Sequence, residues 1–166
     1  MKKIFLFTVF VMLILSLTGC SNVLHGTDEL IEKAREEIPV AEAETIHIEY
    51  AGMCANKDNA LIWFISGNEY QAHYYLPMEC KIVGKDAYTF VHDHKPVKRG
   101  TDIVALLWGN GYSFLVNNPK CKTIRITDYR GTHDIPIEKD SYPFIYYHSL
   151  LPSEYLFLDS EGNQVY

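Results

Sequence analysis

Basic residues are scarce in this sequence. Its 166 residues include 15 Lys and Arg against 21 Asp and Glu, which gives a formal net charge of −6. No dense group of basic side chains stands out, and affinity for a phosphate backbone comes from clustered cations. The composition therefore argues against nucleic acid as a partner, and it offers no electrostatic attraction to anionic lipid.

The signatures of common catalytic sites are also missing. The chain has no Gly-x-Ser-x-Gly elbow, no His-Glu-x-x-His pair and no phosphate-binding loop. Gly109-Asn110-Gly111 lacks the third glycine and the following helix of a dinucleotide fingerprint, so it predicts a hairpin turn. The absence of a Cys-x-x-Cys pair argues against a zinc-finger type of site. These absences predict a protein without catalytic residues.

No stretch reaches the roughly 20 apolar residues that a membrane-spanning helix needs. An uncharged and mostly apolar stretch, residues 4–17, follows Met1-Lys2-Lys3. A short basic start and an apolar segment of roughly 7–15 residues are typical of a cleaved signal peptide. The sequence therefore predicts export.

Leu17-Thr18-Gly19-Cys20 follows directly and resembles the lipobox of bacterial lipoproteins. The resemblance implies that residues 1–19 are removed and that acyl chains such as palmitate are attached to Cys20. It implies a membrane-anchored, extracytoplasmic protein, because each buried CH₂ contributes about 0.8 kcal/mol to membrane binding. Ser21 resembles the outer-membrane address of a Gram-negative host. Processing would leave 13 basic and 21 acidic residues, a net charge of −8.

Residues 20–44 are predicted to form a lipidated tether and one short helix. Apolar residues recur there with helical spacing, at Leu30, Ile31, Ala34 and Ile38. Pro39 then ends the helix. We expect the apolar stripe of this helix to pack on a sheet.

From Thr45 onward the apolar residues alternate, which predicts a single β domain over residues 45–166. Residues 60–65 are continuously apolar and predict a strand covered on both faces. Turns are predicted at Ser66-Gly67-Asn68 and Tyr129-Arg130-Gly131. The other predicted strands are 45–50, 69–76, 79–83, 87–92, 103–108, 112–117, 123–127, 135–137, 144–148 and 155–158. About ten short strands indicate a mainly β fold, an antiparallel β-sandwich or barrel preceded by one short α-helix.

Three cysteines remain once Cys20 is assigned to lipid: Cys54, Cys80 and Cys121. In an oxidising compartment we expect a disulfide between two of them, with the pairing left open. The alternative is three buried thiols, because a domain of this size can fold without disulfides.

His92-Asp93-His94 is the best local candidate for a binding site. In an extended segment the two imidazoles project to one side and can bind one metal ion, with zinc as the first choice. The alternative is that His92 ends the apolar face that Tyr88 and Phe90 form, with His94 in solvent. A third ligand is expected from His47, His73, His133 or a carboxylate such as Asp134.

Aromatic residues form a second group of candidates. Tyr74 with Tyr75 and Tyr146 with Tyr147 place aromatic rings on both faces of their strands. Exposed tyrosines can stack on sugars or anchor a protein interface, whereas buried ones fill the core.

Two functions are therefore predicted. The first is a cell-envelope lipoprotein acting as a non-catalytic binding module for an envelope protein, peptide or glycan. The alternative is a zinc-binding or hydrolytic lipoprotein that uses His92 and His94.

Overall fold

The computed structural model describes residues 23–38, 45–68, 71–98, 100 and 102–165. The predicted signal peptide, Cys20 and the tether positions 20–22 and 39–44 lie outside the described residues. The elements in chain order are β1 (Val23–His25), α2 (Gly26–Glu37), β2 (His47–Asn56), β3 (Asn59–Asn68), β4 (Gln71–Gly84), β5 (Ala87–Asp93), β6 (Val97–Lys98), β7 (Ile103–Trp108), β8 (Gly111–Val116), β9 (Thr123–Asp128), β10 (Gly131–Pro136), β11 (Phe144–His148) and β12 (Glu154–Leu158).

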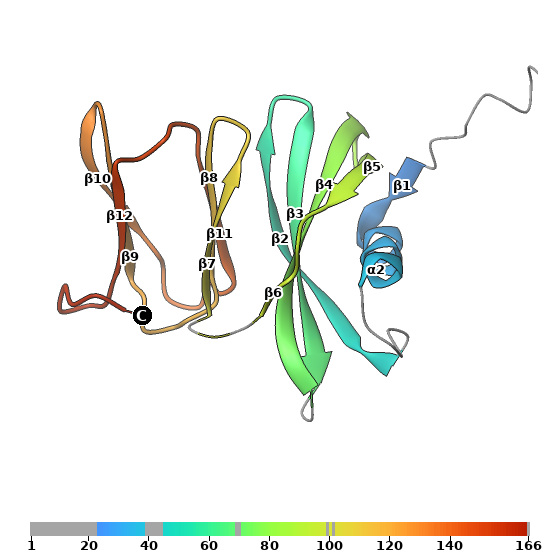
Figure 1. Cartoon of the computed structure of the whole chain (residues 1–166), viewed down its shortest axis with the longest axis horizontal. Coiled ribbons are helices and arrows are strands. Elements are labelled where there is room, and N and C mark those ends of the chain that lie inside the picture. Colours follow the sequence, from blue (N-terminus) through green and yellow to red (C-terminus); the bar gives the residue numbers. More distant parts are fainter. Residues whose placement is uncertain (1–22, 39–44, 69–70, 99, 101, 166) are drawn as a thin grey trace, which may run out of the picture.

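The fold is mainly β, with antiparallel sheets and one helix among the described residues, which confirms the predicted class. Sheet A has the strand order β1-β5-β4-β3-β2, with β6 also paired to β4. Sheet B has the order β11-β8-β7, and sheet C has the order β10-β9-β12. Helix α2, sheet A, sheet B and sheet C follow one another as layers along the long axis (Figure 1).

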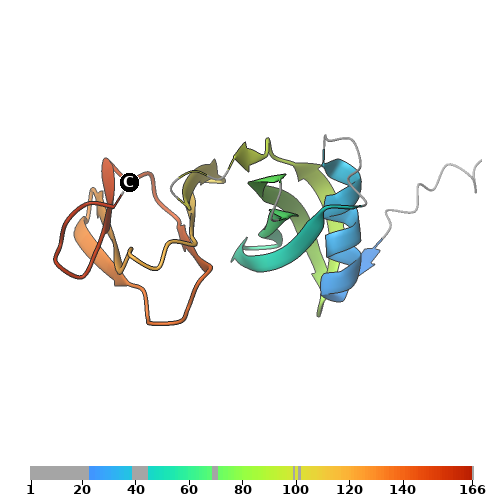
Figure 2. The ribbon, with the colours of Figure 1, turned by 90° about the horizontal axis from the view of Figure 1, so that it is seen from below.

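Helix α2 covers the outer face of sheet A (Figure 2). Its apolar stripe buries Leu30 and Ala34 against sheet residues such as Ile62 and Phe64, as the sequence predicts. Residues 60–64 of β3 have no solvent exposure, because alternate side chains face α2 and sheet B. The continuous apolar stretch is thus explained by burial on both faces.

Sheet B is the central layer of the β-sandwich. Leu115 packs in the core between sheets A and B, whereas its neighbours Phe114 and Val116 pack in the core between sheets B and C. Polar contacts also cross the first of these cores, and in one of them the indole Nε1 of Trp63 donates to Ser113 Oγ at 2.9 Å. Because β8 is buried on both faces, it contributes both to the core shared with sheet A and to the core shared with sheet C.

Two-residue loops connect the hairpins. The predicted loop at Gly109-Asn110 joins β7 to β8, with Trp108 paired to Gly111. A side chain at position 111 has no room, because a Cβ there would clash with the carbonyl oxygen of His148. Unpredicted two-residue loops occur at Lys57-Asp58 and Lys85-Asp86.

The prediction of a turn at Ser66-Gly67-Asn68 is wrong, because β3 continues through it and Asn68 pairs with Gln71. The two strands predicted at 69–76 and 79–83 are one strand, β4, that includes Pro77. Proline is tolerated there although it lacks an N–H, and its carbonyl oxygen accepts a hydrogen bond from the backbone N–H of His94 at 2.9 Å.

No helix in the described part of the chain is long and apolar enough to cross a bilayer.

Candidate metal centre

A β-bulge in the β4–β5 hairpin places His92 beside Glu79. Cys80 pairs with Phe90 and Glu79 pairs with His92, so Val91 is the extra residue. Such an insertion moves the following side chains to the opposite face of the sheet. Phe90 therefore packs toward α2, whereas His92 lies with Glu79 on the face toward sheet B. The expectation that His92 ends the apolar face of Phe90 is wrong for this reason.

The imidazole of His94 completes the group. Its ring centroid lies 4.6 Å from that of His92. The Oε2 atom of Glu79 is 3.9 Å from Nε2 of His92 and 3.6 Å from Nε2 of His94. One potential ligand atom from each side chain lies within 4.8 Å of the other two. We call Glu79, His92 and His94 the candidate metal centre.

The centre is shielded on one side and open on the other. The side chains of Glu79 and His94 are 18% and 21% exposed, and that of His92 is 50% exposed. The Nε2 atom of His94 is buried without a hydrogen-bond partner among the described residues. Buried polar atoms are usually hydrogen-bonded, so this nitrogen is available to a ligand.

Burial lowers the pKa of His94, and the neighbouring His92 lowers it further, against the opposing effect of Glu79. Neutral imidazole is the form that binds a metal ion. The environment of His94 therefore favours the ligand form at neutral pH.

Two imidazoles and one carboxylate are a donor set that zinc binds in proteins, with bonds of about 2.0–2.2 Å. Tetrahedral bonds of that length place ligand atoms about 3.3 Å apart. The Glu79–His94 and Glu79–His92 distances of 3.6 and 3.9 Å exceed this value by about 0.3 and 0.6 Å. Three protein ligands would leave a fourth position for water or an external ligand.

The other residues predicted as third ligands lie elsewhere. His47 contacts Glu49, with 2.8 Å between Nε2 and Oε1. Asp134 accepts two hydrogen bonds from Arg125, at 2.7 and 2.8 Å. His133 lies in sheet C, and the side chain of His73 is outside the described part of the structure. Glu79 therefore takes the place that the sequence analysis assigned to these residues.

The four candidate binding tyrosines are distributed among three different cores. Tyr75 is fully buried and donates its hydroxyl to Asp102 at 2.8 Å. Tyr147 packs in the same core between sheets A and B. Tyr74 packs on the core under α2, and Tyr146 packs in the core between sheets B and C. They do not form one shared exposed surface.

The disulfide expected between two of the three cysteines is not formed. Cys80, Cys54 and Cys121 are free thiols that pack in the three successive cores of the molecule. Burial raises the pKa of the Cys80 thiol to about 12, and burial also raises the pKa values of Cys54 and Cys121. High thiol pKa values disfavour the reactive thiolate.

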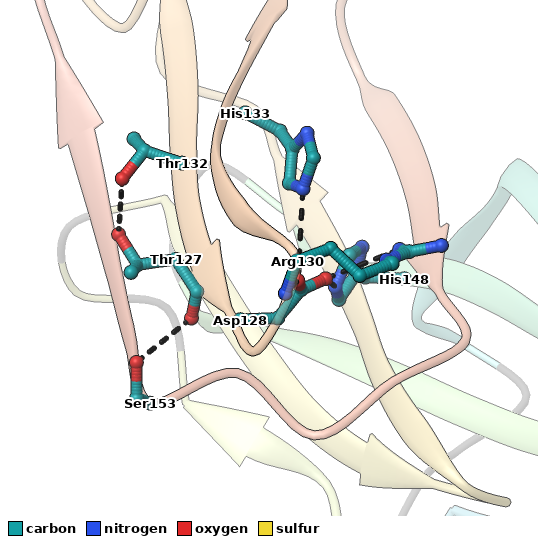
Figure 3. A network of polar contacts seen from close by, with 7 residues as sticks. All are labelled: Thr127, Asp128, Arg130, Thr132, His133, His148 and Ser153. Atoms are coloured by element: carbon teal, nitrogen blue, oxygen red, sulfur yellow. Dashed lines mark hydrogen bonds and ion pairs between the residues drawn. The ribbon is translucent and has the colours of Figure 1, made fainter.

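A second polar group joins sheet C to sheet B around the buried carboxylate of Asp128 (Figure 3). Its Oδ2 atom lies 3.0 Å from Nε2 of His148 and accepts from the Arg130 guanidinium at 3.1 Å. Its Oδ1 atom accepts from the backbone N–H of Arg130 at 2.7 Å and lies 3.6 Å from Nε2 of His133. The hydrogen bond from the Arg130 side chain is the main reason that the pKa of Asp128 falls to about 2. We call these four residues the Asp128 network.

Sequence reasoning missed Glu79 and the Asp128 network. A signal for Glu79 exists: a two-residue loop at Lys85-Asp86, counted outward residue by residue, pairs Glu79 with His92. The hairpin has two register irregularities, one between Ile82 and Gly84 in β4 and the other at Val91 in β5. Each adds one residue to a different strand, so they cancel and Glu79 still pairs with His92. The contact between Asp128 and His148 has no comparable local signal, because it joins strands of different sheets.

Comparison of this chain with protein-family models, with curated proteins and with solved structures finds no match.

Proposed function

We propose that this protein is a lipid-anchored protein of the bacterial envelope that binds a divalent transition-metal ion through Glu79, His92 and His94. Zinc is the first choice of metal. One observation carries the proposal: the bulge at Val91 brings a carboxylate oxygen to within 4 Å of both imidazoles predicted as ligands. The unpartnered Nε2 atom of His94 supports it, because that atom faces the carboxylate.

The ligand set suits an exchangeable ion better than a structural one. Structural zinc sites usually have four protein ligands, whereas three ligands and an open position allow water or another molecule to bind. The centre offers three such ligands, and the half-exposed His92 leaves a way in from solvent. The centre can therefore hold an ion and still exchange it or present it to another molecule.

The anchoring part of the proposal is supported by the lipobox-like segment that ends at Cys20. Replacing Cys20 with alanine is expected to prevent acylation and to release the processed chain from the membrane. Mass spectrometry of the N-terminal peptide and membrane fractionation measure both effects. An N-terminal peptide without acyl mass in the unaltered protein would contradict this part of the proposal.

Isothermal titration of the exported protein with Zn²⁺, repeated with Co²⁺ and followed by absorption, tests the metal site. We expect one ion per chain and a visible Co²⁺ spectrum of low coordination number. The double variant His92→Ala/His94→Ala should lose this binding, while His25→Ala/His47→Ala, which removes two exposed histidines outside the centre, should retain it. Equal binding by both double variants would refute the proposed ligands.

A non-catalytic interaction module remains the second candidate function. The open coordination position favours it, because a side chain of an envelope partner can supply the fourth ligand. Imidazole and a small thiol are suitable probes. A change in the Co²⁺ spectrum on their addition would support an externally supplied ligand, and an unchanged spectrum would argue against it.

A further inference from the structure

Trp108 links the candidate metal centre to sheet B. It is the last residue of β7, and its buried indole Nε1 donates to Oε2 of Glu79 at 2.9 Å. The same carboxylate oxygen faces the imidazoles of His92 and His94. A group that orients this oxygen therefore acts on the ligand geometry of the whole centre.

The position of the indole is itself well determined. Its ring packs edge-on against Tyr147, with 4.9 Å between ring centroids. The hydroxyl of Tyr147 accepts a hydrogen bond from Nδ2 of Asn56 in β2 at 3.0 Å. Strands from both sheets thus hold Trp108 in place, and its N–H points at Glu79 from a fixed direction.

A fixed donor matters because a glutamate side chain has three rotatable bonds and loses rotamer freedom when it is ordered. A hydrogen bond that orders the carboxylate beforehand removes part of this cost from metal binding. The oxygen can accept the indole N–H and bind an ion together, since an ionised carboxylate has about four acceptor positions. Metal binding therefore does not require the hydrogen bond to break.

We infer that Trp108 is a positioning residue for the metal centre, acting through its hydrogen bond to Oε2 of Glu79. This inference rests on the metal-binding function proposed above. Partners of this type in known metal sites change metal affinity by about 10- to 100-fold when they are removed.

The chain contains a matched control for this test. It has two tryptophans, and the other, Trp63, also donates its indole N–H between sheets A and B, to Ser113. The indole N–H of Trp63 donates to Ser113 and not to a residue of the candidate centre. Trp63→Phe and Trp108→Phe therefore make the same chemical change in the same interface, and only Trp108→Phe removes a hydrogen bond to Glu79.

The test compares Zn²⁺ and Co²⁺ affinity in the full exported protein and in these two variants, with circular dichroism to confirm that each is folded. We expect Trp108→Phe to weaken metal binding by about 10- to 100-fold and to alter the Co²⁺ spectrum. Trp63→Phe should bind with unchanged affinity. The tryptophan fluorescence of the Trp63→Phe variant comes from Trp108 alone and should change when metal is added. The tryptophan fluorescence of the Trp108→Phe variant should not change.

The possible failures are distinguishable. If the unaltered protein binds no metal, the proposed function fails and this inference fails with it. If the unaltered protein binds metal and Trp108→Phe binds equally well with the same Co²⁺ spectrum, the inference alone is overturned. Equal weakening in both tryptophan variants would also overturn it, because it would show a general effect of loosening the interface between sheets A and B.

Discussion

The hydrogen bond between Trp63 and Ser113 gives a quantitative test of the packing of sheet B on sheet A. Trp63 and Ser113 are both fully buried, and the indole Nε1 lies 2.9 Å from Ser113 Oγ. Ser113→Ala removes the acceptor and leaves the indole N–H buried without a partner. An unsatisfied buried donor costs about 1–3 kcal/mol of unfolding free energy.

Trp63→Phe/Ser113→Ala removes both partners, so no donor is left unsatisfied. The loss of free energy in this double variant should be smaller than the sum of the two single losses by about 1 kcal/mol, the net value of such a hydrogen bond. In a chain of this size, 1 kcal/mol shifts the melting temperature by about 2–4 °C.

Urea denaturation of the four proteins, followed by circular dichroism, measures the three differences. Strictly additive losses, or a loss below about 0.5 kcal/mol for Ser113→Ala, would show that the indole N–H is satisfied without Ser113. The packing of sheets A and B described above would then need revision.

Two further predictions concern stability. The lowered pKa of Asp128 means that its contribution to stability is present above pH 4 and is lost as the pH falls through about 2. Asp128→Asn should therefore be less stable at pH 7, and its urea midpoint should depend less on pH between 4 and 2; parallel pH profiles for the two proteins would contradict this. Gly111→Ala should destabilise the chain by more than 1 kcal/mol, since its Cβ would clash with a backbone carbonyl, whereas Gly131→Ala, with open space around its Cβ but a positive φ, should cost less. Equal melting temperatures for the two glycine variants would contradict the close approach at His148.

The predictable parts of the fold are those with local causes. Glycine and asparagine at positions 109 and 110 favour a tight turn, and the turn forms. The apolar run in β3 predicts burial on both faces, and the structure confirms it. The break predicted between residues 76 and 79 contains Pro77, and a proline usually interrupts a strand, whereas here β4 continues past it.

The candidate site was only partly predictable. The spacing of His92 and His94 indicates a pair of ligands, and this signal is local because the two residues are only two positions apart in the sequence. The face on which they lie depends on the bulge at Val91, which alternation counted along the strand does not reveal. The third side chain comes from the paired strand, and its identity follows only once the register is known.

The path of the chain through sheets B and C has a consequence for how this protein can be divided. After β8 the chain enters sheet C as β9 and β10, returns to sheet B as β11, and ends in sheet C as β12. The strands of sheets B and C therefore alternate along the chain, and no cut within residues 103–165 separates one complete sheet from the other. A deletion or exchange that keeps both sheets intact has to include all of residues 103–165. Sheet A and α2 have their strand pairing complete within residues 23–98. The chain therefore passes from sheet A to sheet B at the connection after β6, whereas it crosses between sheets B and C three times.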